Sequence, residues 1–236
     1  LKTRRFLKKL KEITPYVSYD IAGTRTGRLT TIKNSFPILT LDRDLRAVIE
    51  PRNDIFIELD FNAAELRTVL ALSEGSQPAG DIHEWISKEV FKTNAPREEV
   101  KKKVFAWLYN PLAENERLES VFDRKKILDM YYDGKAASTV FGRQIEVDER
   151  RAFNYVVQST TSDLLLKRMI KIFDILKSRR SFIAFSIHDS LVLDIAQEDK
   201  DLIQEIVDVF SETDLGKFKA NVSMGKNFKK MQLVQL

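Results

Sequence analysis

Two aspartates stand where short apolar segments end, a setting typical of metal-binding carboxylates. Asp60 closes the segment 54–61 (DIFIELDF), and Asp189 lies in a polar turn between the two apolar halves of 182–195 (FIAFSIHDSLVLDI). Two carboxylates brought together repel each other unless a cation lies between them. A pair of Mg²⁺ ions held by two aspartates suits phosphoryl transfer, since one ion activates an attacking hydroxyl and the other stabilises the leaving group.

Each aspartate also has a simpler interpretation. Aspartate is common in tight turns because its side chain bonds its own backbone, which would account for Asp189. Asp60 precedes the helix-like segment 63–73, and an aspartate at that place often caps the helix that follows. On these stretches alone, both interpretations stay open.

A third set of candidates lies on one predicted helix, 96–110, within the stretch PREEVKKKVFAWLYNP. Arg97, Lys101, Phe105 and Tyr109 recur every four residues, so the period of a helix places them on one broad side. Two cations followed by two aromatic rings could clamp a triphosphate and stack a base. The alternative is an amphipathic helix whose basic end is solvated and whose aromatic end packs in the core.

Helices and strands alternate along the chain without a regular βαβ rhythm, which predicts an α+β fold. Apolar runs rich in β-branched and aromatic residues predict strands, and apolar residues at a spacing of three to four predict helices. The predicted strands are 54–61, the two halves of the hairpin 182–195, and 220–224; the predicted helices are 1–13, 63–73, 83–91, 96–110, 118–132, 148–177 and 199–210.

Composition limits the classes of function. The 236 residues include 43% hydrophobic residues and no cysteine, which excludes disulfides, thiolate metal sites and cysteine nucleophiles. No run of 18 apolar residues occurs, so we expect no membrane-spanning helix and no membrane partner. A net charge of +4 is compatible with a polyanionic partner such as nucleic acid.

Seven segments in order resemble the family A DNA polymerases, the bacterial polymerase I and phage group, over residues 17–228. Individually each likeness is weak, and the order of the set carries the resemblance. Besides the helix of Arg97, Lys101, Phe105 and Tyr109, which is similar to motif B, the segments are SYDIAGTRTGRL (18–29), DFNAAELR (60–67, similar to motif A), GDIHEWISKEVF (80–91), NYVVQSTTSDLLLKRM (154–169), IHDS (187–190, similar to motif C) and GKNF (225–228).

The resemblance implies a right-hand polymerase fold with an antiparallel palm sheet and a compact helical fingers subdomain. It implies a basic helix ending a thumb at 1–15, palm at 16–72 and 138–236, and fingers at 73–137. The thumb and the 3′–5′ exonuclease would be absent from this chain. A further polypeptide or segment would then supply them.

The resemblance also implies roles for individual residues. Asp60, Asp189 and the carbonyl of Phe61 would hold two Mg²⁺ ions, with Mn²⁺ as a substitute, and Lys101 would donate a proton to the leaving pyrophosphate. The nucleotide-binding residues would be Arg97, Lys101, Phe105, Tyr109, Glu65 and His83. The residues that contact primer–template DNA would be Arg28, Asn154, Gln158 and His188.

The implied function is a DNA-directed DNA polymerase that adds dNTPs to a primer 3′ hydroxyl, in the cytoplasm of a bacterial or phage-infected cell and associated with its nucleoid. Two alternatives stay open. Ser190 stands where the family usually has glutamate, and single-subunit RNA polymerases resemble the chain at this point, although Glu65 would crowd a ribose 2′ hydroxyl. The other alternative is a non-catalytic nucleic-acid-binding subunit derived from a polymerase.

Overall fold

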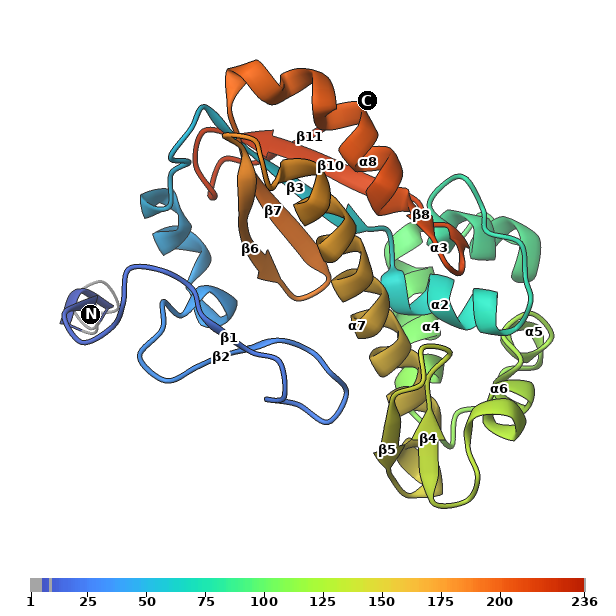
Figure 1. Cartoon of the computed structure of the whole chain (residues 1–236). Coiled ribbons are helices and arrows are strands. Elements are labelled where there is room, and N and C mark those ends of the chain that lie inside the picture. The colour runs from blue at the N-terminus through green and yellow to red at the C-terminus, as the bar shows by residue number, and fades with distance from the viewer. Residues whose placement is uncertain (1–5, 9, 236) are drawn as a thin grey trace. The chain divides into compact units, whose positions relative to one another are not determined.

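The computed structural model describes residues 6–8 and 10–235, which form an α+β fold of two compact units (Figure 1). Of these residues, unit 1 comprises 6–8, 10–60, 167–210 and 220–235, and unit 2 comprises 61–166 and 211–219. Compactness alone does not assign a palm or fingers. The predicted subdomain boundaries after residues 15, 72 and 137 therefore stay predictions.

Unit 1 is built on a five-stranded sheet in the order β11-β10-β3-β7-β6 (Figure 1). The strands β3 and β7 pair antiparallel, as do β6 and β7, and β10 and β11. The predicted strand 54–61, the hairpin and the strand near 220–224 are confirmed. The bounds are β3 Ile55–Phe61, β6 Phe182–Ile187, β7 Ser190–Ile195, β10 Ala220–Gly225 and β11 Gln232–Val234.

The alternation of residues along β3 fixes which side of the sheet the two acids of this strand reach. Ile57, Leu59 and Phe61 are buried, whereas Glu58 and Asp60 are half-buried. Since successive side chains of a strand point to opposite sides, Glu58 and Asp60 share one side. A register slip of one residue would turn both acids toward the apolar side, so burial of the apolar residues holds Asp60 in its place.

The first part of unit 1 packs against the hairpin. Strands β1 (Tyr19–Asp20) and β2 (Thr30–Thr31) pair with each other, and the hydroxyl of Tyr19 donates to the carbonyl of Ser186 in β6. The backbone N–H of Ser186 donates to the same hydroxyl at 2.9 Å. Burial raises the pKa of Tyr19 to about 12, so the hydroxyl keeps its proton and the contact near neutral pH.

Other short elements complete unit 1. The 3₁₀ helices η1 (Ile38–Thr40) and η2 (Arg43–Val48) follow β2. The predicted helix 199–210 begins instead as a 3₁₀ helix, η4 (Gln197–Leu202), and continues as α8 (Ile203–Ser211). Of the predicted basic helix 1–13, residues 6–8 and 10 are helical and the chain turns at Lys11; residues 1–5 and 9 lie outside the described part.

Unit 2 is mainly helical. The long helix α7 (Glu149–Leu176) contributes residues up to Leu166 to unit 2 and its remainder to unit 1. Between residues 10 and 235, and in 6–8, no helix combines the length and the apolar character that a membrane crossing needs. The other elements are α2 Ala64–Leu72, α3 Ile82–Trp85, α4 Arg97–Tyr109, α5 Glu116–Glu119, α6 Arg124–Tyr131, and the hairpins β4 (Ala136–Ser138)–β5 (Gln144–Glu146) and β8 (Glu212–Thr213)–β9 (Gly216–Lys217).

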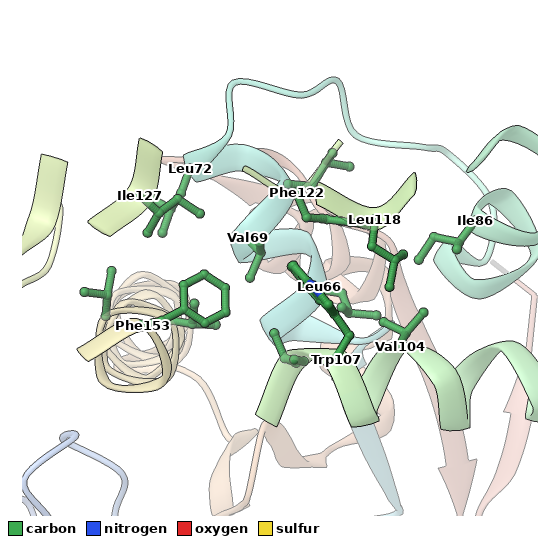
Figure 2. Close-up of a cluster of buried hydrophobic side chains, with 14 of the residues drawn as sticks. Leu66, Val69, Leu72, Ile86, Val104, Trp107, Leu118, Phe122, Ile127 and Phe153 are labelled. Carbon is green, nitrogen blue, oxygen red and sulfur yellow. The ribbon is translucent and has the colours of Figure 1, made fainter. Parts of the chain in front are cut away.

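The core of unit 2 fixes the orientation of α4 (Figure 2). The ring of Trp107 lies 5.9 Å from that of Phe122 and 6.0 Å from that of Phe153, measured between centroids. The guanidinium of Arg124 lies 4.7 Å from the Trp107 ring. The buried residues of α4 are Val100, Val104, Trp107 and Leu108. Because these face the core, the side that carries Arg97 and Lys101 is turned away from it.

Two helix predictions need correction. The predicted helix 118–132 is wrong in its middle, because Asp123 accepts a hydrogen bond from the N–H of Lys126 and starts a new helix, α6. The predicted helix 83–91 begins one residue earlier, after Asp81, and its second half is a π-helical turn, η3 (Ile86–Val90).

Candidate active site

The backbone register of unit 1 brings the two candidate metal aspartates together. Asp60, at the end of β3, pairs directly with Ser190, the first residue of β7, and Asp189 immediately precedes Ser190. The hairpin loop contains only His188 and Asp189, and His188 has the left-handed backbone angle φ of 53°. Few non-glycine residues adopt this conformation, and histidine is among the enriched ones. The short loop therefore leaves Asp189 little freedom to move away from Asp60.

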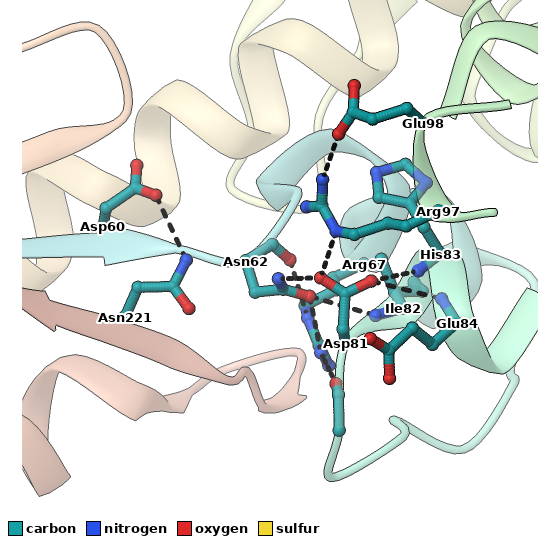
Figure 3. A network of polar contacts seen from close by, with 11 residues as sticks. Asp60, Asn62, Arg67, Asp81, Ile82, His83, Glu84, Arg97, Glu98 and Asn221 are labelled. Carbon is teal, nitrogen blue, oxygen red and sulfur yellow. Dashed lines mark hydrogen bonds and ion pairs between the residues drawn. The ribbon is translucent and has the colours of Figure 1, made fainter. Parts of the chain in front are cut away.

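The pKa of Asp60 reflects this crowding. The pKa of Asp60 is raised to about 6, chiefly by burial and also by the negative charges of Glu58 and Asp189. The amide of Asn221 on β10 opposes this rise by donating to Asp60 Oδ2 at 3.4 Å (Figure 3). A cation at this point would offset the repulsion, since an opposite charge within a few ångströms favours the ionised carboxylate.

Ser190 links the hairpin to a third acid. Its buried hydroxyl donates to Oε1 of Glu58 at 2.9 Å and also lies 3.0 Å from the carbonyl of Ile187. The hydroxyl of Ser186 in turn donates to the carbonyl of Ser190 at 3.0 Å. These bonds tie the end of the hairpin to β3 on the side that carries Asp60.

The two carboxylates fit a Mg²⁺ ion that takes its remaining ligands from water and substrate. Within residues 6–8 and 10–235, no three His, Cys, Asp or Glu side chains are arranged to hold a metal ion by themselves. Magnesium commonly uses one or two carboxylates and completes its shell with water and substrate phosphates. The pair of Asp60 and Asp189 matches that pattern. The ring of Phe61 packs 5.7 Å from that of Phe218, and the metal role of the Phe61 carbonyl stays a prediction.

In unit 2, three of the four predicted residues of α4 form one continuous side-chain row. The ammonium of Lys101 lies 5.7 Å from the ring centroid of Phe105, and the Phe105 ring lies 5.7 Å from that of Tyr109. His83 of α3 joins the row, with its ring 5.9 Å from Phe105. Tyr109 is 45% exposed, so the aromatic end of the helix is not simply core. The row can accept a ligand with charges at one end and a flat ring at the other.

His83 presents an uncharged imidazole to this row. The pKa of His83 is lowered to about 4, chiefly by burial and also by the nearby charges of Arg97 and Lys101, against the opposing effect of Asp81. Its Nδ1 atom is buried and has no hydrogen-bond partner in the part of the chain that the structure describes. A buried polar atom without a partner costs free energy.

Glu65 closes the aromatic end of the row. It lies in the first turn of α2, is only 6% exposed, and accepts a hydrogen bond from the hydroxyl of Tyr109 at 2.5 Å. A carboxylate held in this way has a fixed position beside the two rings. It can therefore act as a steric limit on whatever lies against Phe105 and Tyr109.

At the charged end of the row, Arg97 is held by acids. Its Nε donates to Oδ2 of Asp81 at 3.0 Å, and its Nη1 donates to Glu98 at 2.8 Å (Figure 3). The Asp81 pair is the better shielded, because the side chain of Asp81 is 16% exposed and that of Glu98 is 70% exposed. The guanidinium is thus anchored on one edge.

The four candidate DNA contacts are divided between the units. Asn154 and Gln158 lie one turn apart on α7 in unit 2, and the amide of Asn154 donates to the carbonyl of Tyr109 at 3.5 Å. Arg28 and His188 belong to unit 1. Arg28 is half-buried beyond β1, with its carbonyl bonded by Thr24 at 2.9 Å, and His188 is exposed at the hairpin tip. The structure thus bonds Asn154 to the last residue of α4. The DNA-binding roles of all four residues stay predictions.

Sequence reasoning missed four residues of this neighbourhood. Glu58 had a signal, since it alternates with Asp60 along the strand, and Asp81 had one as the cap of α3. Asn62 and Asn221 had none, because their importance depends on partners far away in the chain.

Comparison with known proteins gives a family match and a fold match. The sequence profile of DNA polymerase family A matches residues 102–230, more than half of the chain. The chain is 34% identical over 113 residues to the thermostable DNA polymerase I of Thermus filiformis, covering 45% of this chain and 13% of that protein. It is 25% identical over 245 residues to DNA polymerase I of Caldicellulosiruptor bescii, covering 81% of this chain and 29% of that protein. The chain thus spans less than a third of the length of either curated relative.

Among solved structures, the chain resembles the POL domain of Pol1 from M. smegmatis, determined in complex with a DNA primer-template and dNTP. The TM-score is 0.76 at 15% sequence identity, and the match covers 98% of this chain and 52% of that chain. At this identity the likeness shows the fold, a right-hand polymerase palm with helical fingers.

Proposed function

The chain belongs to DNA polymerase family A, and from this premise we propose that it carries out template-directed DNA synthesis, adding dNTPs to a primer 3′ hydroxyl by two-metal phosphoryl transfer. The observation that carries the proposal is the strand register that pairs Asp60 with Ser190 and so sets Asp189 beside it. The relatives named above are bacterial, which supports work on DNA in a bacterial cytoplasm.

The proposed mechanism assigns the two metal-binding carboxylates to unit 1. Asp60 and Asp189, with the carbonyl of Phe61, would hold Mg²⁺ or its substitute Mn²⁺, which when bound neutralises charge on the attacking hydroxyl and the leaving pyrophosphate. The hydrogen bond from Asn221 keeps Asp60 Oδ2 oriented, and the bond between Ser190 and Glu58 keeps the hairpin end in place.

The proposed nucleotide site is the row of unit 2. Arg97 and Lys101 bind the triphosphate, and Lys101 also donates a proton to the leaving pyrophosphate. The neutral imidazole of His83 adds a hydrogen bond to a phosphate oxygen. Phe105 lies against the incoming sugar and base, and Tyr109 stacks near the templating base. Glu65, held by Tyr109, fills the space that a ribose 2′ hydroxyl needs.

The proposed partner is primer–template DNA. Arg28, Asn154, Gln158 and His188 contact the minor groove and the primer end, where the acceptors look alike for all base pairs and so report pair shape. We also propose that a further segment or polypeptide supplies thumb and exonuclease functions, because the curated relatives are more than three times as long as the stretch they share with this chain.

The two alternatives are less well supported. RNA synthesis requires space for a 2′ hydroxyl. In the proposed site the buried Glu65, which Tyr109 holds in place, occupies that space. A non-catalytic subunit would have no use for Asp60 and Asp189 side by side, because their repulsion costs free energy when no cation is bound.

Primer extension tests the proposal directly. We expect the chain to extend a labelled primer–template with dNTPs and Mg²⁺, and EDTA to stop the reaction. Asp189→Ala should lower the rate at least about 10³-fold, because metal-assisted charge neutralisation supplies several kcal/mol to the transition state. The exposed Asp208→Asn on α8 serves as the control. Equal rates for Asp189→Ala and the control would reject the metal site.

Arg97→Ala and Lys101→Ala should weaken use of dNTPs more than binding of DNA. We expect KM for dNTP to rise about tenfold or more, which corresponds to about 1.4 kcal/mol for one lost charge-assisted contact. Steady-state kinetics and fluorescence anisotropy with labelled DNA measure the two effects. Lys102→Ala is the matched control, since Lys102 is exposed one position off the row. A larger loss of DNA affinity than of dNTP affinity would show that the row faces DNA instead.

A further inference from the structure

Asp81 stands at the centre of a polar network within unit 2 that joins the segment after β3 to the start of α4 (Figure 3). A single oxygen of Asp81, Oδ2, accepts from the side-chain amide of Asn62 at 2.8 Å and from Nε of Arg97 at 3.0 Å. The other oxygen, Oδ1, accepts from the backbone N–H groups of His83 and Glu84 at 2.9 and 3.1 Å. The carboxylate therefore has donors on both oxygens and is held in one orientation.

The carboxyl group of Asp81 is ionised at neutral pH and well into the acidic range. Burial by itself would raise the pKa of Asp81, but hydrogen bonds from Asn62, Arg97 and the N–H of Glu84 outweigh it and hold the pKa at about 2. An acceptor that is always ionised makes a strong, short bond to a guanidinium.

Asn62 is itself fixed, so Asp81 does not depend on Arg97 for its place. Asn62 is 4% exposed, and its Oδ1 accepts from the N–H of Ile82 at 3.0 Å and from Nη2 of Arg67 at 3.2 Å. Nε of the fully buried Arg67 donates to the carbonyl of Asn62 at 2.8 Å, and Nη2 also donates to the carbonyl of Gly80 at 2.7 Å. Arg67 thus links the carbonyl of Asn62 to that of Gly80, the residue before Asp81, and this link holds Asp81 in a fixed position.

We propose that Asp81, held by Asn62, is a positioning residue that presents Arg97 to the triphosphate of an incoming nucleotide. This inference rests on the proposed function, since it concerns the same nucleotide site. With Nε bound to Asp81, the guanidinium is fixed along one edge and its two terminal amino groups remain to form a bidentate contact with phosphate. Fixing the side chain in advance removes the rotamer entropy that an untethered arginine loses on binding.

Whereas Asp81 presents Arg97 to the triphosphate, Glu98 competes with the triphosphate for Arg97. It contacts Nη1, one of the two groups that the phosphate needs, and its side chain is 70% exposed. Exposed pairs of this kind are weak, so a triphosphate displaces Glu98 at small cost. The two acids next to Arg97 are therefore expected to change nucleotide affinity in opposite directions when they are neutralised.

The test is binding of dATP and of inorganic tripolyphosphate to the whole chain without primer–template, by isothermal titration calorimetry. Asp81→Asn keeps side-chain size and a good helix cap, but it no longer offers a carboxylate to Arg97. We expect Asp81→Asn to weaken both ligands about fivefold and Glu98→Gln to tighten them about twofold. Asp81→Ser, which also caps helices, serves if Asp81→Asn does not fold. Glu99→Gln, whose acid pairs with Lys103 on the same helix, should change nothing.

A double-mutant cycle separates positioning from a structural role. If Asp81 acts through Arg97, Asp81→Asn should have no further effect in an Arg97→Ala background. Equal weakening in both backgrounds would overturn the inference and leave Asp81 a structural cap. If Arg97→Ala weakens binding but Asp81→Asn does not, the inference fails and the proposed nucleotide site stands. If Arg97→Ala leaves both affinities unchanged, the assignment of Arg97 to the triphosphate fails, and the inference fails with it.

Discussion

Asp60→Asn is expected to abolish nucleotide addition and, in metal-free protein at pH 8, to raise the free energy of unfolding. The loss of activity should be at least about 10³-fold if Asp60 holds metal in the proposed two-metal step, which requires its charge. The gain in stability follows from the pKa of Asp60, which is raised from 3.8 to about 6 in the folded chain. Ionising this half-buried acid costs the folded state up to about 3 kcal/mol, and the amide removes that cost.

The pH dependence gives the sign of this effect. A raised pKa means that the folded state binds its proton more tightly, so wild-type stability declines as pH rises from about 4 to about 6 and is lowest above that. The advantage of Asp60→Asn should thus be full at pH 8, shrink as pH falls through 6 and vanish near pH 4. Thermal unfolding with EDTA measures it, with an expected rise of up to about 8 °C in Tm at pH 8. Asp208→Asn should show no such window. If Asp60→Asn is still more stable than wild type at pH 4, or is less stable at pH 8, then ionised Asp60 does not destabilise the folded state.

Glu65→Ala is expected to relax discrimination against ribonucleotides about 10²-fold. The carboxylate of Glu65 is buried and held by Tyr109, so in the proposed site it leaves no space for a 2′ hydroxyl. Removing it opens that space, and a substrate excluded by a clash then regains about 3 kcal/mol of transition-state binding. The ratio of kcat/KM for a dNTP and its matching NTP measures the change.

Two variants show whether the position or the charge of Glu65 matters. Glu65→Gln keeps the volume and should retain most of the discrimination, whereas Tyr109→Phe removes the bond that fixes Glu65 and should relax it by a few-fold. Their folding is checked by thermal unfolding, since Glu65 lies in the buried first turn of α2. If Glu65→Ala lowers the use of dNTP and NTP equally, then Glu65 supports the site without selecting the sugar.

The parts of the site that the sequence predicts are those set by local periodicity. The period of four places Arg97, Lys101, Phe105 and Tyr109 on one side of the helix, and in the structure the last three of these side chains follow one another in a row. The alternating strand and the polar turn of the hairpin put Asp60 and Asp189 at strand ends, where the structure has them. These patterns depend on near neighbours, so one sequence suffices to see them.

What the sequence did not predict depends on partners distant along the chain. Ser190 and Glu58 are 132 residues apart, and Asn221 and Asp60 are 161 apart, so only the strand register brings each pair together. The break in the helix predicted over 118–132 had a different cause. There a single capping side chain, Asp123, overrode the helix propensity of its neighbours. Strands of two or three residues, such as β1 and β8, are too short to show any period.

The hydrogen bonds between the hydroxyl of Tyr19 and the backbone of Ser186 have a consequence for biosynthesis. The two residues are 167 positions apart, which at ordinary translation speeds separates their emergence from the ribosome by roughly 10–30 s. During that interval the phenol near the start of the chain has no β6 to receive it. The hairpin that holds Asp189 can therefore reach its final position only after the residues between β1 and β6 have been made, so a nascent fragment ending before β6 never carries an assembled pair of acids.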